Sequence, residues 1–148
     1  MKFLIAFASP KRSALTLEVA AKHAKALSAE IFVLRVIADP KRVGVVAELI
    51  ASERPMEKAK SQIADAVQSL QQKGIKATGE VRIGRVGRTI IEVVKEVNAD
   101  MVFVGTIGLS SSPFFMMPKD PIVNYLVEHC PASLVLVRGI VPADADAD

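Results

Sequence analysis

Short aliphatic segments alternate along the chain with longer segments in which apolar residues recur every three or four positions. A continuous apolar run, such as residues 3–7, is typical of a parallel strand that is covered on both faces. The pattern predicts strands at residues 3–7, 31–37, 77–83, 101–104 and 134–137. The regular succession of strand and helix implies right-handed crossovers between the strands. We therefore expect an α/β fold, with an open, mainly parallel sheet of five strands and helices on both faces.

The helical segments carry clear start and stop signals. Ser13 stands where it could cap the first helix. A later helix has Pro55 near its first turn and Gly74 as its stop. Asp120 followed by Pro121 predicts an N-cap with proline at the first helical position. Further helical segments are expected at residues 43–51 and 90–97.

Two of the predicted strands have the character of sheet edges. Apolar and polar residues alternate over residues 77–83, so one face of this strand is more polar than the other. The last strand has no such alternation, and its backbone and apolar side chains need a cover if it too lies at an edge. Pairing with a second copy of the chain would supply that cover. We predict a homodimer whose interface contains Leu134, Val135, Leu136 and Val137.

Composition places these elements in one domain. The chain has 148 residues, and its mean hydropathy of +0.34 and formal charge of +3 exclude a wholly disordered protein. We assign residues 1–141 to a single domain. Residues 142–148 alternate alanine with aspartate and are expected to form a disordered acidic tail.

Several classes of function are excluded or disfavoured by the same residues. The basic residues are spread along the chain, and Trp is absent, so we expect no nucleic-acid binding. No apolar run approaches the roughly 20 residues of a membrane span. The single Cys130 cannot form an internal disulfide, so the cytoplasm is the expected location. No metal-ligand spacing is present, and His23 and His129 lack partners for catalysis, so we expect neither a metal site nor an enzyme.

Two segments near the last two strands carry a family resemblance. The turn GTIGLS follows the fourth strand at residues 105–110, and NYLVEHCP precedes the fifth strand at residues 124–131. Together with residues 17–24, 29–37 and 98–105, they resemble the universal stress protein family over about residues 2–139. The resemblance implies an adenine nucleotide alpha hydrolase-like, Rossmann-like sheet of order 3-2-1-4-5 that dimerises through its fifth strand. It also implies a ligand site at the carboxyl ends of the first and fourth strands.

The nucleotide motif of the family is incomplete in this chain. Nucleotide-binding members carry Gly-x2-Gly-x9-Gly-Ser/Thr after the fourth strand, and here Gly105 and Gly108 match only the first half. Lys119 stands near the place of the final pair, and Ala8 replaces an aspartate that usually ends the first strand. The candidate ligand-binding residues implied by the resemblance are Ala8, Ser9, Val36, Gly105, Thr106, Gly108, Ser110 and Lys119.

These departures predict a degenerate nucleotide site without a cofactor. The expected function is a non-enzymatic role in stress response or regulation, exerted through partners. The alternative is an ATP- or AMP-binding, weakly hydrolytic protein that grips phosphates with residues 110–112 and Lys119. Residues 114–117 are two Phe and two Met, which would pack on their own domain, join the dimer or meet a protein partner.

Overall fold

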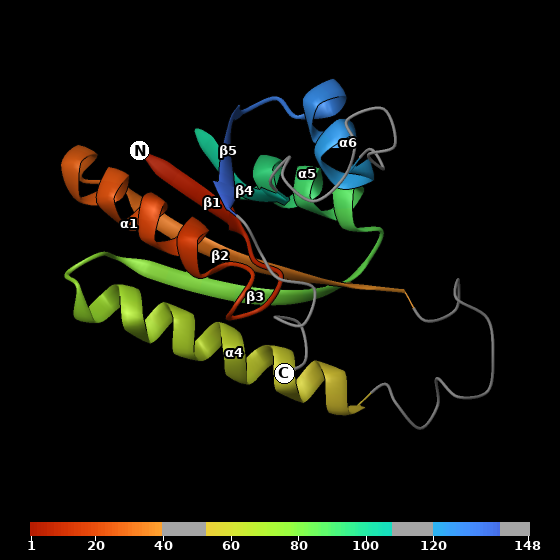
Figure 1. The fold of residues 1–148 in the computed structure, drawn as a ribbon, viewed down its shortest axis with the longest axis horizontal. Helices are drawn as coiled ribbons and strands as arrows, with labels where there is room; N and C mark the ends of the chain where they lie inside the picture. The colour runs from red at the N-terminus through yellow and green to blue at the C-terminus, as the bar shows by residue number, and fades with distance from the viewer. Residues whose placement is uncertain (40–52, 108–119, 140–148) are drawn as a thin grey trace.

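The computed structural model describes residues 1–39, 53–107 and 120–139 (Figure 1). The expectations for residues 43–51, 114–117 and 142–148 lie outside these ranges. The elements in chain order are β1 (Lys2–Ala6), α1 (Ala14–Leu27), β2 (Glu30–Ala38), α4 (Glu53–Gln72), β3 (Ala77–Gly84), α5 (Val86–Val97), β4 (Met101–Ile107), α6 (Pro121–His129) and β5 (Ser133–Gly139).

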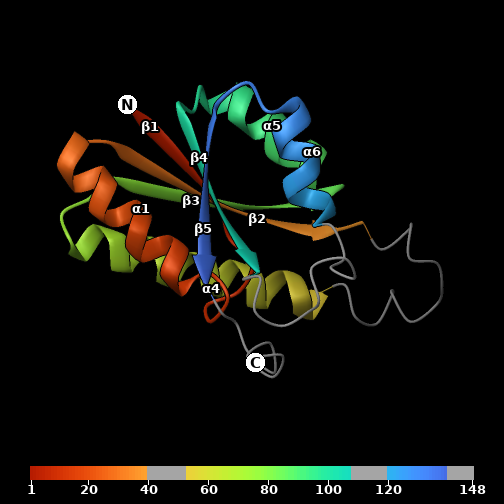
Figure 2. The same ribbon diagram turned by 45° about the horizontal axis from the view of Figure 1, so that its top comes forward.

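The strands form one sheet of order β3-β2-β1-β4-β5, and every neighbouring pair is parallel. β1 lies at the centre, where Phe3 is opposite both Ile31 of β2 and Met101 of β4. β3 and β5 are the two outer strands (Figure 2). The predicted fold class, an open five-stranded parallel sheet with helices on both faces, is therefore confirmed.

The helices cover the sheet in two layers, with α1 and α4 on one face and α5 and α6 on the other (Figures 1 and 2). Alternate residues of β1 point to opposite faces, so Phe3 and Ile5 pack with the α1 and α4 side, whereas Leu4 packs with α5 and α6. All three side chains are fully buried. The continuous apolar run of this strand thus reflects burial on both faces.

Strand lengths differ from the prediction most clearly in β4. This strand continues to Ile107, beyond the expected end at residue 104, because its ladder with β5 includes Gly105 opposite Val137 and Thr106 opposite Arg138. A glycine and a threonine do not extend an aliphatic pattern, so the sequence did not reveal this extension. The ladder is a property of the paired strands and becomes visible only in the sheet.

The predicted role of Ser13 as a helix cap is wrong in mechanism. Ser13 occupies the N-cap position of α1, but its side chain makes no capping hydrogen bond. Instead its Oγ accepts a hydrogen bond from the backbone N–H of Ala8 at 2.8 Å. The fold brings the N–H of Ala8, in the preceding loop, close to this buried hydroxyl, and this N–H takes the place of the helix amides as its donor. Gly74, by contrast, follows α4 with a φ of 82° and acts as the predicted stop.

The outer strand β5 combines buried and exposed side chains. Val137 is only 7% exposed and packs in the core beneath α1, whereas Leu136 on the opposite face is 42% exposed. Of the predicted interface residues, Leu136 therefore offers the most accessible apolar side chain, while Val137 belongs to the interior of the same chain.

Within the residues that the structure describes, none of the helices has the length and apolar character needed to cross a membrane.

Candidate functional site

A cleft of about 450 Å³ opens at the carboxyl ends of β1 and β4. The direction of winding of the sheet reverses between these two strands, and open α/β sheets bind ligands at such switch points. Four of the predicted site residues line this cleft: Ala8, Val36, Gly105 and Thr106. The structure therefore brings together residues that lie almost 100 positions apart in the sequence.

The loop between β1 and α1 is closed by its own hydrogen bonds. Ser9 accepts the backbone N–H of Arg12 on its Oγ at 3.2 Å and the backbone N–H of Ser13 on its carbonyl oxygen at 2.9 Å. With the bond from Ala8 to Ser13, these contacts fix the loop against the start of α1. Ser9, predicted as a ligand contact, does not line the cleft and instead shapes the loop that does. The other predicted residues, Gly108, Ser110 and Lys119, lie outside the described ranges.

Gly105 has a structural reason to be glycine. A Cβ atom at this position would lie 3.0 Å from Oγ1 of Thr16, a buried residue in the first turn of α1. The helix thus approaches β4 so closely that any side chain here would push on it. The glycine that resembles the start of a phosphate-binding motif is explained by this close approach, so it is weak support for phosphate binding in this chain.

Asp120 occupies the N-terminus of α6 at the rim of the cleft. Its Oδ1 accepts hydrogen bonds from the backbone N–H groups of Ile122 at 3.0 Å and Val123 at 3.1 Å. Pro121 has no backbone N–H, which completes the predicted capping arrangement. The amides that could otherwise face a phosphate at this helix end are therefore directed to a carboxylate of the chain itself.

Replacing Asp120 by alanine should remove this cap and lower the free energy of unfolding by about 0.5–2 kcal/mol. Urea denaturation of the wild type and of Asp120→Ala measures the loss directly. Asp120→Asn is the matched control, because asparagine caps helices about as well as aspartate. Equal stabilities for Asp120→Ala and the wild type would show that the carboxylate does not hold the start of α6.

Positive charge gathers at the other side of the cleft. Arg35 near the end of β2 lines the cleft together with Lys11 and Arg12 of the β1–α1 loop. Arg35 is half-buried, and burial followed by the nearby positive charge of Arg12 lowers the pKa of its guanidinium. No described carboxylate forms a salt bridge with Arg35. Asp120 is the only acidic residue among the described residues that line the cleft.

Sequence reasoning overlooked Arg35. The available signal was a lone charged residue within the otherwise aliphatic segment 31–37, close to the carboxyl end of a strand. A charged residue near the carboxyl end of a parallel strand lies close to the end of the sheet at which ligands bind. The sequence could not show that the side chain would share a cavity with Arg12, because that depends on how the β1–α1 loop folds over β2.

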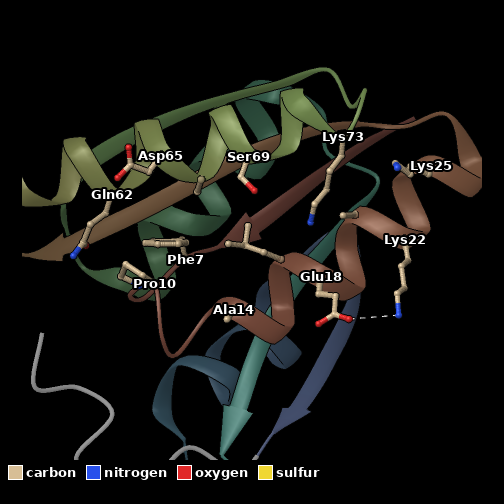
Figure 3. A pocket seen from close by; sticks show the side chains of 13 residues that line it. Phe7, Pro10, Ala14, Glu18, Lys22, Lys25, Gln62, Asp65, Ser69 and Lys73 are labelled. Atoms are coloured by element: carbon tan, nitrogen blue, oxygen red, sulfur yellow. Dashed lines mark ion pairs between the residues drawn. The ribbon is translucent and has the colours of Figure 1, made fainter.

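A second hollow, of about 660 Å³, lies between α1 and α4 (Figure 3). Phe7 and Ala66 contribute to its apolar lining, and Lys73, which directly follows α4, extends toward α1 (Figure 3). Glu18 forms an ion pair with Lys22 at 3.5 Å on its α1 side. Both signs of charge are present, and the hollow lies on a helical face of the sheet rather than at the ends of the strands. It is therefore a weaker candidate than the cleft.

The described lining of the cleft contains no His or Cys that could act as a general base or nucleophile. Across the described ranges, no group of three or more potential metal ligands comes together either. His129 bonds through Nδ1 to the carbonyl oxygen of Tyr125 at 3.1 Å and stacks on its ring, away from the cleft lining.

The sheet order and the cleft at its switch point define the adenine nucleotide alpha hydrolase-like fold. A sequence model described as the Universal stress protein family matches residues 1–138. The chain belongs to this family. A search of curated protein sequences found no match.

Solved structures from several organisms share the fold. The universal stress protein UspA from Lactobacillus plantarum is 21% identical, with a TM-score of 0.71 over 93% of this chain and 97% of its own. The universal stress protein from Archaeoglobus fulgidus in complex with dAMP is 14% identical, with a TM-score of 0.66 over 93% and 97%. A family protein from Arabidopsis thaliana with AMP bound is 16% identical, with a TM-score of 0.67 over 100% and 99%.

Proposed function

We propose that this protein is a non-enzymatic regulatory member of the universal stress protein family whose nucleotide site is degenerate. Its cleft does not hold adenosine in the manner of the nucleotide-binding members. The observation that carries the proposal is the charge distribution of the cleft: Ala8 stands at the end of β1, and the one described acidic residue of the lining, Asp120, is occupied with the cap of α6. The hydroxyl groups of a ribose need hydrogen-bond acceptors, and the side chain of Ala8 offers none at the position where nucleotide-binding members usually carry an aspartate.

The experiment compares ligands that separate the adenosine group from its phosphates. Isothermal titration with adenosine should give no heat, and ATP should bind no more tightly than inorganic tripolyphosphate. The Archaeoglobus fulgidus relative solved with dAMP serves as the positive control for the assay. Binding of adenosine, a clear preference for ATP over tripolyphosphate, or stoichiometric ATP in the purified protein would contradict the proposal.

The second candidate function is binding of ATP or AMP, with weak hydrolysis, through a divergent phosphate loop. Two observations favour it: Val36 still lines the cleft, and relatives from two organisms were solved with dAMP and AMP. In this alternative, residues 110–112 and Lys119 supply hydroxyls and positive charge to the phosphates. The same titration separates the two functions, because only the alternative requires the adenosine group.

The proposed regulatory role is exerted by a cytoplasmic homodimer that pairs through β5. Its support is the position of β5 at the edge of the sheet and the exposure of Leu136 on it. A second surface for a protein partner is the apolar segment 114–117, which lies outside the described ranges. The cytoplasmic assignment rests on the presence of a single cysteine.

A further inference from the structure

The hollow between α1 and α4 has an apolar part near the start of α1. Buried Phe7 and Ala66 form its base, and half-buried Leu17 lines it above them. Pro10 and Ala14 line the same part and are exposed. Apolar surface therefore faces solvent here, and a chain segment laid along the hollow would cover it.

Positive charge stands at the other end of the hollow. Lys25 lies in the last turn of α1, and Lys73 directly follows α4. Figure 3 shows both at the end of the hollow that lies away from Asp65. Among the described residues, neither lysine forms an ion pair, whereas Lys22 is paired with Glu18 at 3.5 Å. This end of the hollow is therefore suited to carboxylates.

The C-terminal segment starts close to this surface. A Cβ atom on Gly139, the last residue of β5, would lie 3.2 Å from Cδ2 of Leu15 in the first turn of α1. Residues 140–148 follow, and nine residues span at most about 30 Å. The distance along α1 from Leu15 to Lys25 is about 15 Å. The segment is therefore long enough to cross α1 and reach the lysines.

The order of residues in this segment matches the order of surfaces in the hollow. Residues 140–142 are Ile, Val and Pro, and the three aspartates Asp144, Asp146 and Asp148 follow. The hollow likewise changes from apolar near the start of α1 to positively charged at Lys25 and Lys73. A short acidic segment lacks the apolar surface to fold by itself, but it can bind where a surface of the opposite charge is offered.

We propose that residues 140–148 bind in the hollow between α1 and α4 of the same chain. Residues 140–142 lie on the apolar part, and the aspartates lie beside Lys25 and Lys73. The inference goes beyond the proposed function, because it concerns a surface other than the cleft. Exposed ion pairs are individually weak and screened by salt, so the binding should weaken as the salt concentration rises.

Paramagnetic relaxation in the full-length chain tests the proposal. A nitroxide spin label is attached at Ala147→Cys in a Cys130→Ser background, which removes the single natural cysteine and keeps all three aspartates. In the ¹⁵N-labelled protein, the amide signals of Ala21 and Ser69 should broaden, because these residues line the hollow. The amide signal of Val94, in α5 on the other face of the sheet, should not broaden.

Two lysine variants show whether charge holds the segment. The double variant Lys25→Met, Lys73→Met keeps the aliphatic stems and should lower the broadening at Ala21 and Ser69 severalfold. Lys95→Met is the matched control, because Lys95 is an exposed lysine in the last turn of α5, outside the lining of the hollow. It should leave the broadening unchanged.

The same spectra identify other positions of the segment. Broadening centred on Val36 would place it in the cleft and overturn the proposal, as would unbroadened signals for Ala21 and Ser69. Full broadening in the double lysine variant would overturn the role of the two charges. A mixture of spin-labelled chains without ¹⁵N and ¹⁵N-labelled chains without the spin label should show no broadening. Broadening in that mixture would assign the hollow to the segment of a second copy and overturn binding within one chain.

Discussion

Replacing Phe103 by alanine is expected to lower the free energy of unfolding by about 3–5 kcal/mol. Phe103 lies in β4 and is fully buried, with its ring 5.0 Å from that of Phe3 in β1 and 5.6 Å from that of His23 in α1. The truncation removes a large apolar surface from three elements at once and leaves a cavity that a central strand cannot collapse to fill. Chemical denaturation monitored by circular dichroism measures the loss.

Two further variants test the reason for this effect. Phe103→Leu retains most of the volume and should cost clearly less than the alanine variant. Ile83→Ala removes an apolar side chain that is 52% exposed on the outer strand β3, and should change the stability by about 0.5 kcal/mol or less. Equally small losses of stability for Phe103→Ala and Ile83→Ala would contradict the packing of Phe103 against β1 and α1.

Val137→Asp is expected to prevent folding or to lower the free energy of unfolding by about 3 kcal/mol or more. The side chain of Val137 is 7% exposed and packs in the core under α1, so aspartate would place a carboxylate among apolar groups. The neighbouring variant Leu136→Asp is the matched control, because this side chain is 42% exposed on the same strand. We expect Leu136→Asp to fold and to convert the proposed dimer into a monomer in light scattering.

The two variants Val137→Asp and Leu136→Asp separate an effect on folding from an effect on dimer formation. A cooperative unfolding transition near that of the wild type for Val137→Asp would contradict its burial. A stable dimer of Leu136→Asp would contradict pairing through β5, since a charge directly beside the same charge of a second copy should be strongly unfavourable.

Parts of the site were predictable because their signals are local. Asp120 before Pro121 defines a helix start through hydrogen bonds to amides two and three residues away, and the structure contains those bonds. The family resemblance likewise rests on short segments in a fixed order, and it led to Ala8, Val36, Gly105 and Thr106 at one cleft. Both a cap next to its own helix and the order of the elements can be recognised in the linear sequence, without knowledge of tertiary contacts.

Other features depended on contacts between distant segments. Ser13 looks like a cap from its neighbours, but the fold brings the N–H of Ala8 to its hydroxyl. Gly105 looks like a phosphate-binding glycine, but the fold places Oγ1 of Thr16 only 3.0 Å from the position that a Cβ would take. In both cases the sequence offered a common local role, and a partner from another segment decided otherwise.

By itself, the sequence determined the class of the fold, the order of strands and helices, and membership of the family, because aliphatic periodicity and turn signals act over a few residues. Only the tertiary structure decided the character of the site. It placed Arg35 and Arg12 on one cavity, turned Asp120 toward its own helix, and separated Val137 in the core from Leu136 at the surface. The reason is that charge repulsion, burial and close approach depend on distances between segments, which are set only when the sheet and its helices pack.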